Sequence, residues 1–161
     1  ERRVAGIDRA RMTQAEFIAT MHAVADPRDR LARSDLTYTL NRIGELHVLR
    51  QDHAAALPLF ERALALRAAA SDASPENASL CRDLCVSFWK VAEVSKNLAE
   101  TGDRDALLAR AEDHLRRCVA ELDRMERDGT LSEYDAAWPE LARKELDEVA
   151  AQRQTEDRGE P

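Results

Sequence analysis

Apolar residues recur along the chain at three- and four-residue steps, the spacing typical of helices with one buried face. This pattern predicts helices over residues 7–25, from about 30 to 50, from 52 to 70, from 78 to 100, from 104 to 128 and from 139 to 152. The intervening stretches hold Pro, Gly or several turn-forming residues, as in Ser71–Asn77. The fold class expected from this pattern is all-α.

The chain also repeats itself at an offset of 48 positions, so that Ser34 aligns with Arg82. Across this offset, identical or similar residues pair as Asp35/Asp83, Leu36/Leu84, Leu40/Phe88, Ile43/Val91, Gly44/Ala92, Glu45/Glu93 and Leu46/Val94. A repeat of this length predicts stacked supersecondary units rather than one closed core. The small residues of the Gly44/Ala92 pair are expected to let two helices approach closely.

The spacing of large and small residues within each unit resembles that of the tetratricopeptide (TPR) repeat. The matching positions are Leu40, Ile43, Gly44, His47, Ala56, Phe60 and Ala63 in the first unit, and Phe88, Val91, Ala92, Ser95, Ala111, Leu115 and Cys118 in the second. The offset of 48 residues exceeds the roughly 34 residues usual for this family. It is similar to the repeat length of the long TPR units in bacterial multidomain proteins. The resemblance implies an α-solenoid of antiparallel helical hairpins that forms a right-handed superhelix.

The repeat pattern predicts a single helical domain over residues 1–161. Its expected parts are a half repeat at 7–25, repeat 1 at 31–73, repeat 2 at 78–128, a C-terminal cap at 131–153 and a disordered tail at 154–161. The half repeat lacks its own partner helix, which implies either further sequence upstream or a docked neighbour. The chain is therefore interpreted as the recruitment or regulatory part of a larger bacterial effector protein.

In TPR proteins the first helix of each hairpin lines a concave groove that binds a protein or peptide. By this resemblance, the expected partner-binding residues are Tyr38, Asn41, Glu45, Val48, Leu49, Val86, Trp89, Glu93, Lys96 and Asn97. Tyr38 and Trp89 are the expected anchors, because large aromatic side chains dominate contact energies; the alternative for Trp89 is a place in the core between repeats. Glu45 and Glu93 favour a partner of basic or mixed character.

Composition excludes some classes of function. The net charge of -7, with both signs interspersed, provides no Lys/Arg stripe for a nucleic acid. The sequence has no apolar run of about 20 residues that would cross a membrane. Three cysteines, Cys81, Cys85 and Cys118, form no paired framework, which indicates a reducing compartment and hence a cytoplasmic location.

Candidate chemistry is weak, so no catalytic residue, metal or cofactor is expected. Cys81 and Cys85 share a helical face, but no nearby His or Cys completes a zinc site. The sequence also lacks a Gly-rich phosphate loop and a local set of nucleophile, base and orienting group. The leading hypothesis is thus a protein-protein interaction module and not an enzyme. Two alternatives stay open: a module that self-associates as a homodimer, and a compact helical enzyme.

Overall fold

A computed structural model describes residues 30–157, and every regular element in that range is helical. The elements are α2 (Arg30–Leu49), α3 (His53–Asp72), α4 (Ala78–Leu98), α5 (Arg104–Arg127), the short 3₁₀ helix η2 (Glu133–Asp135) and α6 (Trp138–Asp157). The all-α prediction is confirmed for this range. The predicted half repeat at 7–25 and residues 158–161 of the expected tail lie outside the described residues.

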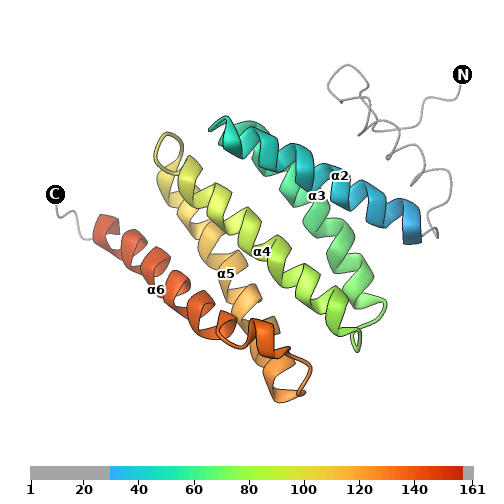
Figure 1. Cartoon of the computed structure of the whole chain (residues 1–161). Helices are drawn as coiled ribbons and strands as arrows, with labels where there is room; N and C mark the ends of the chain where they lie inside the picture. The colour runs from blue at the N-terminus through green and yellow to red at the C-terminus, as the bar shows by residue number, and fades with distance from the viewer. Residues whose placement is uncertain (1–29, 158–161) are drawn as a thin grey trace, which may run out of the picture.

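The helices form two layers (Figure 1). Helices α2, α4 and α6 lie side by side in one layer, and α3 and α5 lie behind them. The main packing contacts join each helix to the next one in sequence, from α2 through α6. Within the front layer, ion pairs connect Lys90 of α4 to Glu45 of α2 and Lys96 of α4 to Glu145 of α6. The front layer therefore consists of alternate helices of the chain.

Short polar caps set where the helices begin. The side chain of Asp52 accepts a hydrogen bond from the Ala55 amide at the start of α3, and Asn77 and Asp103 do the same for α4 and α5. Each cap satisfies an amide that has no partner inside its helix. After α5 the chain turns through Gly129, whose φ of 67° is a conformation that glycine adopts without strain. These ends lie within a few residues of the predicted ones.

The C-terminal helix is longer than the sequence pattern predicted. α6 continues to Asp157, whereas the expected helix ended near Gln152 and a disordered tail began at 154. Arg153, just beyond the expected end, donates hydrogen bonds to Asp105 and Glu112 and so holds this part of α6 against α5. Residues 154–157, which the sequence pattern placed in the tail, thus belong to α6 in the structure.

Apolar contacts between the layers form the core. Its main cluster joins α3, α4 and α5 and includes Phe60, Phe88 and Leu122. Gly44 of α2 lies directly against this cluster, because a Cβ atom built on it would stand 2.6 Å from Cε1 of Phe60. The predicted close approach at Gly44 is confirmed, and it brings α2 down onto α3.

An ion pair with a buried carboxylate attaches the segment before α6 to the front layer. The guanidinium of Arg82 on α4 donates to both carboxylate oxygens of Asp135, over 2.8 and 3.0 Å. The Ser132 hydroxyl donates to the same carboxylate over 2.7 Å. The hydrogen bonds from Arg82 are the main reason why the pKa of Asp135 lies below its usual value. They outweigh burial, which would raise that pKa. Asp135 is thereby kept ionised although only 7% of it is exposed.

Candidate functional site

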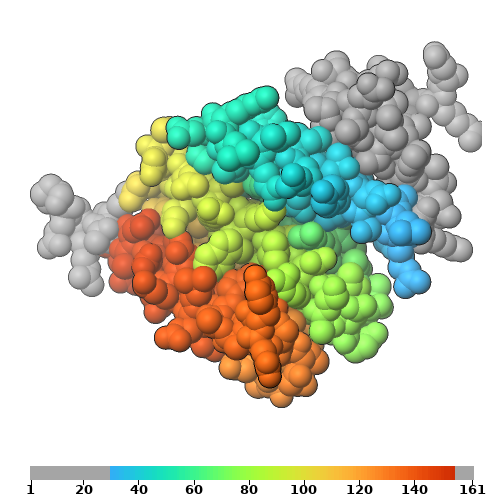
Figure 2. Space-filling view, viewed as in Figure 1, coloured from blue at the N-terminus to red at the C-terminus, as the bar shows by residue number. Residues whose placement is uncertain are grey.

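Two cavities follow the seam between α2 and α4, with α3 as their floor. The larger, of about 480 Å³, lies between the N-terminal halves of α2 and α4 and the last turns of α3. The smaller, of about 310 Å³, lies between the C-terminal ends of α2 and α4. In the space-filling view, the surface of α3 lies recessed between the ridges of the front layer (Figure 2). We call this pair of cavities the α2/α4 groove.

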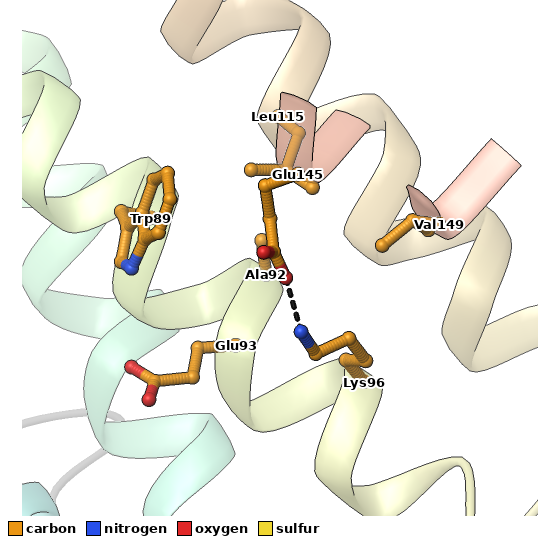
Figure 3. Close-up of a pocket in the computed structure, with 7 residues that line it drawn as sticks. All are labelled: Trp89, Ala92, Glu93, Lys96, Leu115, Glu145 and Val149. Carbon is orange, nitrogen blue, oxygen red and sulfur yellow. Dashed lines mark hydrogen bonds and ion pairs between the residues drawn. The ribbon is translucent and has the colours of Figure 1, made fainter. Parts of the chain in front are cut away.

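A third cavity, of about 130 Å³, lies between α4 and α6. Trp89, Glu93 and Lys96 extend into it from α4, and an ion pair joins Lys96 to Glu145 (Figure 3). Its volume is well below the roughly 300–1,000 Å³ of typical small-molecule sites. This cavity is therefore smaller than a typical small-molecule site.

The structure brings several of the expected binding residues together. Glu45, Val48, Leu49 and Glu93 line the smaller cavity of the α2/α4 groove. Tyr38 lines the larger cavity and is 66% exposed. Exposed Tyr38 and Leu49 therefore line different cavities of this groove, eleven residues apart along α2.

The remaining expected residues lie elsewhere. Asn97 lines a separate cavity near the turn between α2 and α3. Asn41 is only 5% exposed, and its Oδ1 atom has no hydrogen-bond partner within residues 30–157. Val86 is half-buried, and it does not line any of the cavities described above. Trp89 is half-buried against both main core clusters while one edge lines the third cavity, so it has a packing role.

One carboxylate of the groove, that of Glu45, is partly neutralised by neighbouring cations. Glu45 accepts hydrogen bonds from Lys90 and, over 3.0 Å, from Arg42. Burial would raise the pKa of Glu45, but the hydrogen bond and charge of Lys90, helped by Arg42, outweigh it and hold the pKa below its usual value. The ammonium group of Lys90 also lies 5.5 Å from the ring centre of Phe60. Glu45 is thus not a bare charge that would repel an acidic ligand.

The sequence analysis missed the arginines of the larger cavity. Arg30 and Arg33 line it from α2, and Arg67 lines it from α3. The family resemblance directed attention to the first helix of each hairpin, and Arg67 belongs to the second. The sequence did contain a signal for Arg67. It lies at i, i+4 spacing between Ala63 and Ser71, which are both buried, so it shares their face of α3.

The reactive side chains are held in the core. Cys81, Cys85 and Cys118 are all buried as free thiols. The hydrogen bond with Cys118, followed by burial, raises the pKa of Cys85 far above its usual value, so this thiol stays protonated. Burial lowers the pKa of His114, which stacks on Phe88 at 5.9 Å. Within residues 30–157, His, Cys, Asp and Glu form no group of three that could hold a metal ion.

No helix in the described part of the chain has the length and apolar character that crossing a membrane requires. No family model, curated protein or solved structure matches the chain in comparisons with known proteins. The likeness to TPR repeats therefore remains a prediction that depends on the residue pattern quoted above.

Proposed function

We propose that the chain is a protein-protein interaction module, a TPR-like α-solenoid with a right-handed superhelix, and that the α2/α4 groove binds an extended peptide segment of a protein partner. The observation that carries the proposal is the pair of aligned cavities, of about 480 and 310 Å³, along one seam of the front layer. In this proposal an extended peptide lies along the seam and reaches both cavities. Exposed Tyr38 and Leu49 are its anchors.

Burial of the reactive groups supports a binding module over an enzyme. The three thiols are buried, and the pKa of the most perturbed one is shifted toward the unreactive form. Free thiols also support our proposal of a cytoplasmic location. In the wider proposal, the module recruits partners to, or regulates, a larger bacterial effector protein. Self-association is the alternative that light scattering tests, because a homodimer would show twice the mass of the chain.

The test is selection from a library of random 12-residue peptides displayed on phage, followed by affinity measurement with fluorescent synthetic copies. We expect enriched peptides to lose about tenfold or more in affinity for Tyr38→Ala and for Leu49→Ser. Neither side chain is buried, so both variants should keep the fold, which circular dichroism checks.

Matched controls are available on the same chain. Tyr134 is 90% exposed on η2, and Leu141 is 52% exposed on α6, and neither lines the α2/α4 groove. Tyr134→Ala and Leu141→Ser should therefore leave binding unchanged. The proposal fails when no peptide is enriched, or when groove and control variants weaken binding equally.

A further inference from the structure

We propose that the larger cavity of the α2/α4 groove binds the side-chain carboxylate of an Asp or Glu residue within the partner peptide, and that Arg67 is the main contact. This inference rests on the proposed function, since it names the chemistry that one end of the groove recognises. It also gives the bound segment a direction, with its acidic residue beside the N-terminal half of α2. The evidence lies in the hydrogen bonding and charge of the cavity wall.

The guanidinium of Arg67 is half-buried without a salt bridge to any other residue in the 30–157 range. Its Nη1 atom donates to the backbone oxygen of Asp83 over 3.1 Å and to the hydroxyl of Ser87 over 3.0 Å. Both acceptors are neutral. Because a guanidinium has five N–H donors, Arg67 keeps donors free for a ligand in the cavity that it lines.

Burial removes the Arg67 guanidinium from water, and the described residues compensate only part of the free-energy cost. Burial lowers the pKa of Arg67 below its usual value, and the charge of Asp83 opposes that shift without cancelling it. A charge removed from water needs a paired, hydrogen-bonded partner. A carboxylate in the cavity would supply one, in the planar two-point geometry that suits a guanidinium.

The two ends of the groove differ in charge. Among the residues that line the larger cavity, Arg30, Arg33 and Arg67 face a single acid, Asp83. The smaller cavity is lined by two acids, Glu45 and Glu93, and by the single cation Lys90. The larger cavity has an excess of cations that the smaller cavity lacks, which gives a bound segment a preferred direction. An acidic residue fits the first end, and an apolar or basic residue fits the second.

The closing experiment has two independent measurements. In the first, N-acetyl-glutamate α-amide, which carries only the side-chain carboxylate, is titrated into the protein while the Nε–Hε signal of Arg67 is followed by NMR. N-acetyl-glutamine α-amide is the neutral control. We expect saturable shifts with the acid and none with the amide. An unchanged Arg67 signal in the presence of the acid would overturn the inference.

In the second measurement, the peptides enriched on the wild-type chain are synthesised with amidated C-termini and with Glu replaced by Gln. We expect about a tenfold preference for Glu, the size of one charge-assisted contact. Arg67→Gln should abolish that preference. The matched control is Arg127→Gln, which removes the same charge from an exposed residue at the end of α5. Equal losses from both variants would indicate bulk electrostatics and refute a specific contact.

A second variant guards against a folding defect in Arg67→Gln. Arg33 lines the same cavity, and its side chain has no hydrogen bond or salt bridge to other residues of the described range. The Arg33→Gln variant should therefore fold normally. We expect it to weaken the preference for Glu over Gln in the peptide. Binding that depends on Tyr38 but shows no preference for Glu would retain the proposed function and reject this inference. A response of the Arg67 signal to the acid without any peptide binding would retain the carboxylate site and reject the proposed peptide-binding function.

Discussion

Gly44→Ala tests the close contact between α2 and α3. In a free helix this change is stabilising by about 1 kcal/mol, because alanine has the higher helix propensity. Here the new methyl would stand 2.6 Å from Cε1 of Phe60, against an ordinary carbon contact of about 3.5–4.0 Å. The ring would have to retreat by about 1 Å, although Phe60 is only 3% exposed and packed in the main core cluster.

Overpacking of this kind costs about 1–3 kcal/mol, which exceeds the gain in propensity. We expect a net destabilisation of about 1 kcal/mol. Urea unfolding followed by circular dichroism at 222 nm measures it. With an m-value of about 2 kcal/mol/M, the midpoint should fall by about 0.5 M while the m-value stays constant.

A double-mutant cycle identifies the contact as the cause. In a Phe60→Leu background the ring is absent, so Gly44→Ala should become stabilising by about its propensity gain. The coupling energy between the two sites is then about 2 kcal/mol, within the range found for residues in contact. A rise of the midpoint by about 0.5 M on Gly44→Ala in the wild-type background would refute the close approach.

Three further predictions concern buried and paired groups. Asp135→Asn should destabilise the protein by about 2 kcal/mol at pH 7. Because the folded-state pKa of Asp135 is lowered, the stability advantage of the wild type is present above the ordinary carboxyl pKa near 3.8 and is lost as the pH falls through the folded-state pKa. Urea titrations at several pH values between 2 and 7 test this dependence. The thiol of Cys85 should resist a thiol reagent at pH 8 in the native protein and react promptly in urea; rapid native labelling would contradict its burial. Glu145→Gln should cost less than about 1 kcal/mol, since its pair with Lys96 is partly exposed, and a larger loss in thermal unfolding would show that this seam depends on the pair.

The helices could be predicted from the sequence because their determinants are local. Apolar spacing and capping residues such as Asp52 and Asn77 act within one or two turns, so the predicted ends agree with the structure within a few residues. The contact at Gly44 was predictable because a small residue at a repeated position has few other reasons to be there.

The parts that could not be predicted depend on distances between helices. Lys90 neutralises Glu45 across the seam between α4 and α2, and nothing in the spacing of either helix indicates that pair. Arg153 near the end of α6 pairs with acids of α5. Likewise, Arg67 becomes part of the groove only when α2 and α4 flank the end of α3. For these residues, sequence patterns identify charged side chains but not the residues with which they pair.

The two kinds of contact in this fold respond differently to solution conditions. Ion pairs bridge the front helices at Lys90–Glu45 and Lys96–Glu145, whereas apolar side chains, supplemented by ion pairs such as Arg153–Glu112, join the front layer to the back layer. Salt screens charges at a partly exposed seam, but it does not weaken apolar burial. Raising ionic strength should therefore loosen the lateral spacing of α2, α4 and α6 at constant helix content. The width available to a ligand would then be adjustable without unfolding.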